Sequence, residues 1–251
     1  MNIGILYEIA GAWRMATGYP PPLVKKKNIN ISERYLVFFP FIGLITGILF
    51  YVIDKSLEFF SIKETVAGIN AIRALLIVFL GVAISHGNAL VGFSKLLGKR
   101  YPVCDKKLFT FQNGTTFTVI TLLLLLLHFF SASQLIAHSH TKWLIVVYTF
   151  SFCMRLELGN SPCEQCGTFF SSLPDIKNKA TNMEYLLAFI LFIFSGYPLP
   201  TLCSFLLLIF GLRVLLKKMD MQGKVLTEEA YQTYSYVWEF SLLLAGALLL
   251  S

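Results

Sequence analysis

The sequence is poor in charge. Only 14% of its 251 residues are Asp, Glu, Lys or Arg, and 21 basic residues outnumber 14 acidic ones. Soluble globular domains carry about 25% charged residues, so the shortage argues against an ordinary soluble domain. Hydrophobic residues make up 56% of the chain, and the mean hydropathy is +0.68. This composition indicates an integral membrane protein and excludes an intrinsically disordered chain.

Cysteines and familiar enzyme motifs are also scarce. The five cysteines are an odd number scattered along the chain, which does not make a disulfide framework. Cys163 and Cys166 form a CxxC motif, but a zinc site needs a second pair of ligands, and the chain has neither another CxxC nor an HxxxH. We therefore interpret this motif as incidental. The motifs GxxxxGK[ST], GxGxxG, HExxH and GxSxG are absent too, so their enzyme classes have no support.

Long apolar runs take the place of charge. A membrane-spanning helix needs about 20 mainly apolar residues. The run 185–216 is too long for one span and contains the sequence GYPLP at 196–200, where proline would interrupt a helix, so we predict a hairpin of two helices there. The predicted fold is an all-α polytopic membrane protein with seven helices, or six if the short run is re-entrant. The other predicted spans are 35–53, 66–85, 115–132, 143–154 (the short run) and 236–250.

Basic residues concentrate on one side of this topology. Of the 21 Lys and Arg residues, only Lys55, Lys63 and Lys142 fall on the side opposite the N-terminus, and Arg73 falls within a span. Cytoplasmic loops carry the excess of Lys and Arg, so we expect a multi-pass protein of the inner (plasma) membrane with a cytoplasmic N-terminus. The net charge of +7 then reflects topology and contact with lipid headgroups rather than nucleic-acid binding.

The domain organisation follows from the same pattern. Residues 1–34 are predicted to be a cytoplasmic or interfacial segment, followed by a single transmembrane helical domain over 35–251. Its long polar loops, 86–114, 155–184 and 217–235, would all lie in the cytoplasm. An active site would therefore open to that side, and its basic rim favours anionic or amphipathic substrates.

Four stretches, in order along the chain, resemble one enzyme family. They are WRMATGYPPP at 13–22, FPFIGLITG at 39–47, CDKKLFTFQNGTTF at 104–117 and the tail over 215–250. They are similar to the N-terminal segment, the first span, the second polar loop and the closing helix of the cobalamin synthases, the adenosylcobinamide-GDP ribazoletransferases. The resemblance implies a membrane transferase that joins adenosylcobinamide-GDP to α-ribazole or its 5′-phosphate and releases GMP, with Mg²⁺ as cofactor.

This sequence differs from the family pattern at the family's acidic signature. The family pattern His-Leu-Asp-Gly-Leu-Ala-Asp-x-x-Asp-Gly follows the second span, and its Asp residues are expected to hold divalent metal around the substrate's pyrophosphate. Here the stretch reads SHGNALVGFSKL, residues 85–96. His86 matches the family's His, but Asn88, Gly92 and Lys95 stand at the Asp positions. An Asp-rich Mg²⁺ site is therefore lost from this loop.

The second loop keeps Asp105 and Lys107 where the family has Asp and Arg. The resemblance implies catalytic roles for Asp105, Lys107, His86 and Asn88, with Asp105 also the metal ligand. It implies substrate binding by Lys95, Asn113 and Arg155. Either a lysine stands in for the metal, or the fold serves another task. The alternatives are a non-catalytic relative that binds a corrinoid, a lipid or a partner membrane protein, and an unrelated small transporter.

Several other polar residues fall in or near the predicted spans. Arg73 lies inside a span, where a charge is costly and marks a functional hypothesis; Glu239 is its candidate partner, provided that the two helices meet at the same depth. Arg155 and Glu157 are interpreted as part of a substrate mouth or as a membrane-edge ion pair. His128 is predicted to pack between helices. His138 and His140, in an outer loop, give a weak metal signal.

Overall fold

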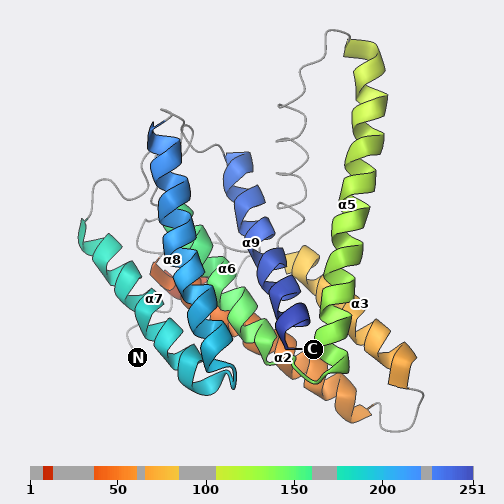
Figure 1. The fold of residues 1–251 in the computed structure, drawn as a ribbon, viewed down its shortest axis with the longest axis horizontal. Helices are drawn as coiled ribbons and strands as arrows, with labels where there is room; N and C mark the ends of the chain where they lie inside the picture. The colour runs from red at the N-terminus through yellow and green to blue at the C-terminus, as the bar shows by residue number, and fades with distance from the viewer. Residues whose placement is uncertain are drawn as a thin grey trace.

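The chain is all-α wherever its structure is described. The computed structural model describes residues 8–13, 37–60, 66–84, 106–159, 174–221 and 228–250, and within these ranges it contains helices and short turns but no strand. This confirms the all-α part of the predicted fold. The long helices are α2 (Phe39–Phe60), α3 (Val66–Ile84), α5 (Lys106–Ala137), α6 (Trp143–Gly159), α7 (Pro174–Phe194), α8 (Pro198–Met221) and α9 (Glu228–Leu249) (Figure 1).

The predicted break in the run 185–216 is confirmed. Helix α7 ends at Phe194 and α8 begins at Pro198, where a missing backbone N–H costs nothing because the first turn of a helix has no internal acceptor for it. Gly196 between them has φ of +79°, a left-handed conformation that glycine adopts without steric penalty. The Ser195 hydroxyl accepts a hydrogen bond from the Tyr197 amide and pairs with the Thr201 hydroxyl, which ties the turn to α8.

Helix α6 is the centre of the bundle. It contacts α2, α7, α8 and α9, and its residues Trp143, Val146, Phe150 and Leu156 are almost completely buried. The run 143–154 is the start of a regular helix that continues to Gly159. An apolar helix that is hydrophobic on all sides belongs in an interior, and this one is surrounded by the others.

Small residues let α2 approach α6 closely. A Cβ atom placed on Gly43 would lie 2.6 Å from the Tyr148 carbonyl oxygen, and one placed on Gly47 would lie 2.6 Å from the Ile145 Cα atom. Gly43 and Gly47 are four residues apart and share one face of α2, which is the small-xxx-small arrangement that brings helix backbones together. The glycines that made FPFIGLITG recognisable in the sequence thus have a packing role.

The N-terminal side of α2 adjoins a second, smaller core. Residues 8–13 are helical, and Ala12 is buried against Phe39, Phe152 and Leu156. This part of the segment 1–34 therefore packs on the helical bundle.

The helices extend into stretches that hydropathy assigned to loops. Helix α5 begins at Lys106, inside the predicted loop 86–114, and α7 begins at Pro174, inside the predicted loop 155–184. Helix α8 continues to Met221, inside the predicted loop 217–235. Hydropathy marks where apolar residues stop, whereas backbone hydrogen bonding continues through good helix formers such as Lys, Gln, Glu and Met.

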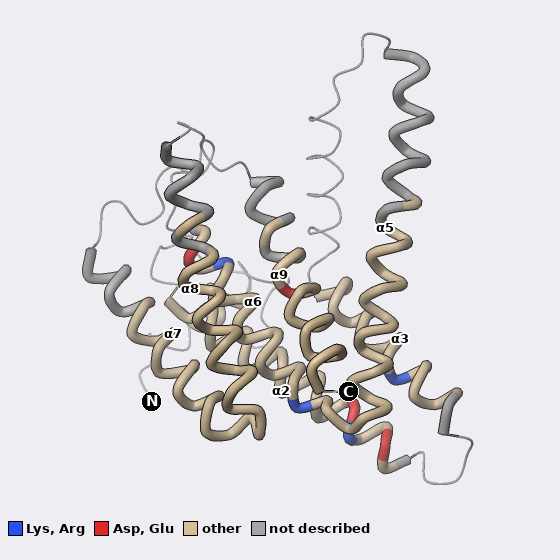
Figure 2. Tube along the Cα trace, in the orientation of Figure 1, with Lys and Arg blue, Asp and Glu red and all other residues tan. Residues whose placement is uncertain are grey.

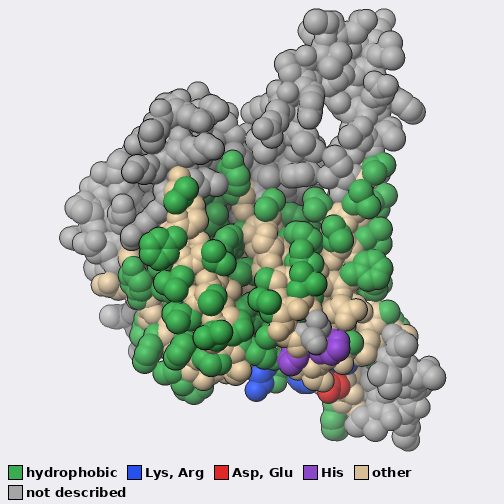
Figure 3. Space-filling view, viewed as in Figure 1, with side chains coloured by type: hydrophobic (Ala, Val, Ile, Leu, Met, Phe, Trp, Pro, Cys, Tyr) green, Lys and Arg blue, Asp and Glu red, His purple; other side chains and the backbone are tan. Residues whose placement is uncertain are grey.

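Large apolar side chains are exposed around the outside of the bundle. Figure 3 shows them as a broad belt over the described helices, with Lys, Arg, Asp, Glu and His side chains gathered at one end. On α8 the exposed stripe runs from Leu199 to Val214, about 22 Å of helix at 1.5 Å per residue. By length and composition, one described helical stretch, Phe39–Phe59, suffices to cross a membrane; the other apolar stretches with described side chains are shorter.

Candidate functional site

Most of the residues that the sequence singles out lie outside the described part of the chain. His86, Asn88, Lys95 and Asp105 lie there. So do the CxxC motif and Gly92, which stands where the family has an Asp. Lys107 and Asn113 lie on the first turns of α5, and the described part of the structure does not include their side chains. Their predicted roles stay predictions. Arg155 lies on α6, within the described part of the chain.

Helix α6 carries a polar face within its apolar surroundings. Tyr148, Ser151 and Arg155 follow one another at spacings of three and four residues, which places them on one side of the helix. The Arg155 guanidinium carbon lies 4.5 Å from the centre of the Phe152 ring, a cation–π contact. The Tyr148 ring packs edge-on against Phe50 of α2, with ring centroids 4.6 Å apart.

Glu239 of α9 is the acid that this face meets. Its side chain is buried, and the Ser151 hydroxyl donates a hydrogen bond to Glu239 Oε2 at 3.3 Å. The positive charge of Arg155 is near enough to stabilise the negative form of Glu239. The predicted pairing of Glu239 with Arg73 is therefore wrong. Arg73 pairs instead with Asp54 of α2, and α3 and α9 run through the bundle in opposite directions (Figure 1).

Two aromatic groups extend this polar interior toward α5. Tyr236 lies one turn before Glu239, and His128 of α5 stacks on it with ring centroids 6.0 Å apart and planes 22° apart. The His128 ring also contacts Phe240, so the prediction that His128 packs between helices is confirmed. The Tyr148 and Tyr236 hydroxyls and both His128 ring nitrogens have no hydrogen-bond partner among the described residues.

A second acidic pair lies between α6 and α7. Glu157 of α6 and Glu184 of α7 are near enough for their negative charges to act on each other, and both act on the buried Cys153 thiol. Glu184 is only 3% exposed, and its Oε1 atom has no hydrogen-bond partner among the described residues. Glu184 is a residue that sequence reasoning passed over. Its position could have marked it as a candidate, because Glu184 is a lone acid directly before the apolar run that starts at Tyr185.

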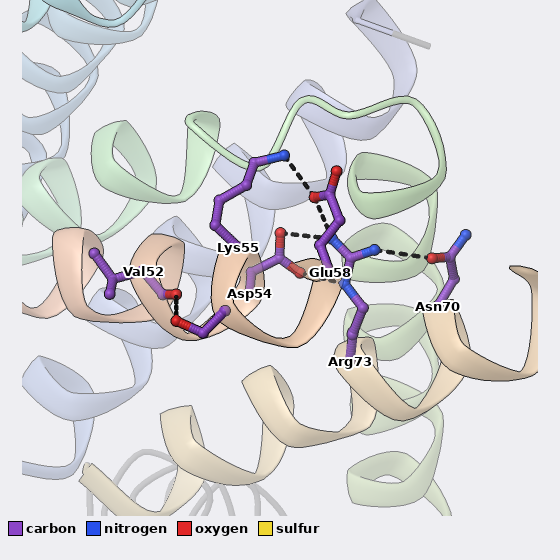
Figure 4. A network of polar contacts seen from close by, with 7 residues as sticks. Val52, Asp54, Lys55, Glu58, Asn70 and Arg73 are labelled. Atoms are coloured by element: carbon purple, nitrogen blue, oxygen red, sulfur yellow. Dashed lines mark hydrogen bonds and ion pairs between the residues drawn. The ribbon is translucent and has the colours of Figure 1, made fainter. Parts of the chain in front are cut away.

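Arg73 belongs to a separate network at the opposite end of the bundle (Figure 4). Its Nε and Nη2 atoms donate to the two carboxylate oxygens of Asp54 at 2.8 Å each, a bidentate pair. Nη2 also donates to Glu58 at 3.0 Å, and Nη1 donates to Asn70 at 3.1 Å. Lys55 bonds Glu58 at 2.6 Å. Asp54 was overlooked because it lies one residue beyond the predicted span 35–53.

This network explains Arg73 without a ligand. Asp54 is completely buried and Arg73 is 6% exposed, so each neutralises a charge that would otherwise be costly in the interior. The contacts join the last turns of α2 to the first turns of α3. We interpret the network as a clamp on this pair of helices. Figure 2 shows that the charged residues of the described helices lie toward the two ends of the bundle.

The two histidines of the outer turn, His138 and His140, lie side by side. Figure 3 shows histidine side chains at the edge of the apolar belt. Ser139 between them has φ of 59°, and the His138 and His140 rings are stacked with centroids 6.4 Å apart. His140 Nδ1 shares a hydrogen bond of 2.9 Å with the Tyr197 hydroxyl. Burial raises the pKa of the Tyr197 phenol, so this hydroxyl keeps a proton to share. The described residues contain no group of three or more His, Cys, Asp and Glu able to hold a metal.

Comparison of the chain with protein-family models, curated proteins and solved structures finds no match. The resemblance to the cobalamin synthases therefore rests on the sequence stretches quoted above. The structure adds the arrangement of helices and the polar groups of α6, α7 and α9.

Proposed function

We propose that this protein is a multi-pass membrane protein of the cobalamin synthase type. The exposed apolar belt supports membrane insertion, since soluble monomers rarely expose contiguous apolar patches larger than a few hundred Å². The distribution of Lys and Arg supports an orientation with the ends of α3, α6 and α8 and the starts of α5, α7 and α9 in the cytoplasm.

The proposed reaction joins adenosylcobinamide-GDP to α-ribazole or its 5′-phosphate. A ribazole hydroxyl attacks the phosphorus that is attached to the cobinamide, a new P–O bond forms, and the phosphoanhydride bond to GMP breaks. GMP leaves with the electron pair of that bond, and the hydroxyl proton passes to a base or to solvent. Positive groups must neutralise the developing charge on the phosphates. The proposed residues for this task are Lys107, Lys95 and Arg155, with Asp105, His86, Asn88 and Asn113 positioning the reactants.

The observation that carries this proposal is the order of four family-like stretches along one chain, with polar segments at the same end of the helical bundle. Arg155 adds a planar guanidinium at that end, a group whose paired N–H donors fit phosphate oxygens. Mg²⁺, when bound, would supply further neutralisation of the phosphates.

The test is a direct assay. Membranes that contain the protein are incubated with adenosylcobinamide-GDP, α-ribazole and Mg²⁺, and cobamide formation is followed by chromatography and mass spectrometry. We expect product with the wild type and none with Asp105→Ala. Absence of product from the folded wild type with Mg²⁺, Mn²⁺ or Co²⁺ would reject the transferase.

A second function is favoured by one specific observation, the replacement of the signature acids by Asn88, Gly92 and Lys95. A non-catalytic relative would bind a corrinoid, a lipid or a partner membrane protein without turnover. Equilibrium binding of adenosylcobinamide-GDP to the purified protein, with no cobamide formed, would support this alternative over the enzyme.

A further inference from the structure

Three buried side chains on three helices carry polar atoms that no described residue satisfies. They are His128 of α5, Tyr148 of α6 and Tyr236 of α9, and each is at most 6% exposed. Both ring nitrogens of the histidine and both tyrosine hydroxyls lack a hydrogen-bond partner among the described residues. A buried polar group without a hydrogen bond is costly, so several of them in one place indicate a ligand that bonds them.

The packing of the helices brings these side chains into one cluster. Helix α9 lies between α5 and α6 and contacts both (Figure 1). The His128 ring stacks on Tyr236, with ring centroids 6.0 Å apart. Glu239 lies one turn after Tyr236 and accepts the hydrogen bond from Ser151 of α6. Tyr148 lies one turn before Ser151 on the same face of α6, so each member of the cluster lies beside the next.

The Tyr148 hydroxyl faces a loosely packed part of α3. A Cβ atom placed on Gly81 would lie 3.0 Å from this hydroxyl and would meet no other atom of a neighbouring helix within 4 Å. A Cβ atom placed on Gly43, where α2 packs against α6, would meet three atoms of α6 within 3.0 Å. The Gly81 side therefore leaves space beside the hydroxyl. Water suits such a place, since a buried water molecule needs two to four polar partners and the cluster supplies them.

The cluster is closed by apolar side chains toward the outer turn 138–142. In that direction α5, α6 and α9 contribute Leu135, Trp143 and Leu243, which are almost completely buried in the main core. Trp143 Nε1 donates a hydrogen bond of 2.9 Å to the Leu242 carbonyl oxygen, so this buried N–H is satisfied by the protein itself. A chain of water molecules would therefore stop at the cluster and would not cross the bundle.

Polar side chains continue in the opposite direction, toward the end where α6 ends and α9 begins. Thr121 lies two turns before His128 on α5, and its buried hydroxyl also has no partner among the described residues. Arg155 lies one turn after Ser151 on α6. The polar groups thus lead from the middle of the bundle to the end that we propose to face the cytoplasm.

His128 is the group in this cluster best suited to move a proton. An imidazole can accept a proton on one ring nitrogen and release one from the other near neutral pH, and an ionisable group inside a membrane span marks a functional site. His128 is the only ionisable residue of α5 between 110 and 137, and the neighbouring stretches 39–50 of α2 and 74–84 of α3 contain none. The other ionisable side chains at the cluster come from α6 and α9: Tyr148, Arg155, Tyr236 and Glu239.

We propose that this cluster holds water molecules that carry protons between the cytoplasmic end of the bundle and His128. The water molecules bridge the imidazole, the two tyrosine hydroxyls and Glu239. A hydronium ion at the cytoplasmic end passes a proton along them: an O–H bond breaks as the N–H bond on His128 forms, and water remains. The reverse steps return the proton to the same side. This path needs membrane insertion but no transferase activity.

The test detects water at His128 in a lipid bilayer. Full-length protein with ¹⁵N-labelled histidine and tryptophan is reconstituted in phosphatidylcholine bilayers, and solid-state NMR measures the transfer of magnetisation from water protons to ring nitrogens. We expect transfer at the His128 nitrogens and none at Trp143 Nε1, a buried ring N–H that already has a protein acceptor. His128→Asn and Trp143→Phe identify the two signals, and the exposed His138 is the reference for an imidazole in bulk water.

The same samples test the movement of protons. After the buffer is replaced by D₂O, the His128 N–H signal should be lost while the Trp143 N–H signal persists. Lowering the buffer pH should shift the His128 signals to those of the doubly protonated imidazole. Tyr148→Phe combined with Tyr236→Phe removes two of the hydroxyls that hold the water, so it should weaken the transfer from water to His128.

Three results would overturn the proposal, and the first two need no variant that must fold. One is a folded wild type without transfer from water to His128. Another is transfer without loss of the His128 N–H signal in D₂O, which would show trapped water and no proton path. The third is equal transfer in the wild type and in the folded double Phe variant. None of these measurements uses a substrate, so failure of the transferase assay leaves them unaffected.

Discussion

Removing Arg73 should strongly destabilise the protein, because its partner is completely buried. Arg73 makes two hydrogen bonds of 2.8 Å to Asp54 and two longer ones to Glu58 and Asn70. Arg73→Ala leaves the Asp54 carboxylate buried without its counter-charge, and breaking a buried ion pair in this way costs about 3–5 kcal/mol. The partly exposed contact between Lys55 and Glu58 should contribute only about 0.2–1 kcal/mol.

The assay is denaturation of the purified protein in detergent, with one double-mutant cycle. Arg73→Ala and Asp54→Ala should each lower the free energy of unfolding by about 3–5 kcal/mol, and the double variant should lose much less than the sum of the two because no charge remains buried without its partner. Arg73→Lys tests the geometry, since it keeps the charge but loses the bidentate fork. If Arg73→Ala changes stability by no more than Glu58→Gln does, the clamp between α2 and α3 is refuted.

Three further predictions concern packing and polar contacts, all measured by the same denaturation assay. Gly47→Ala should lower the free energy of unfolding by about 1–3 kcal/mol, because the added Cβ atom would meet the Ile145 backbone. Gly68 has open space around it, so Gly68→Ala should leave the stability unchanged or raise it. Equal effects of the two substitutions would refute close packing of α2 on α6. In a cycle of Ser151→Ala and Glu239→Leu, the coupling should be about 0.5–1.5 kcal/mol, and additive losses would contradict the hydrogen bond. Tyr197→Phe should lower the free energy of unfolding by about 0.5–1.5 kcal/mol and speed amide hydrogen exchange in the turn 138–142. Unchanged exchange in that turn would argue against the hydrogen bond between Tyr197 and His140.

The helices and their principal break could be predicted from the sequence, because they depend on local features. A long apolar run favours a helix because its length exceeds that of an ordinary strand, and the prolines of GYPLP interrupt a helix. The boundaries were less accurate. Lys106 and Met221 lie within helices although they lie beyond the apolar runs, since hydropathy is not what ends a helix.

The membership of the polar clusters could be predicted only in part. Arg73, Arg155 and Glu239 stood out as ionisable residues in or beside apolar runs, and all of them make buried or partly buried contacts. Asp54 and Glu184 were missed because each lies just outside an apolar run, where an acid looks like an ordinary boundary residue. The predicted roles of His86, Asn88 and Asp105 stay predictions, since those residues lie outside the described ranges.

From the sequence alone follow the all-helical class, the hairpin around Gly196 and the concentration of basic residues in the polar segments between apolar runs. All three depend on composition and on neighbours along the chain. Only helix packing determines which polar residues pair: Arg73 pairs with Asp54, and Glu239 pairs with Ser151. Those pairs depend on which helices touch and at what depth, and that depends on close contacts such as the one that Gly43 allows between α2 and α6. A residue's neighbours across a helix interface are far apart in sequence, so no local pattern encodes them.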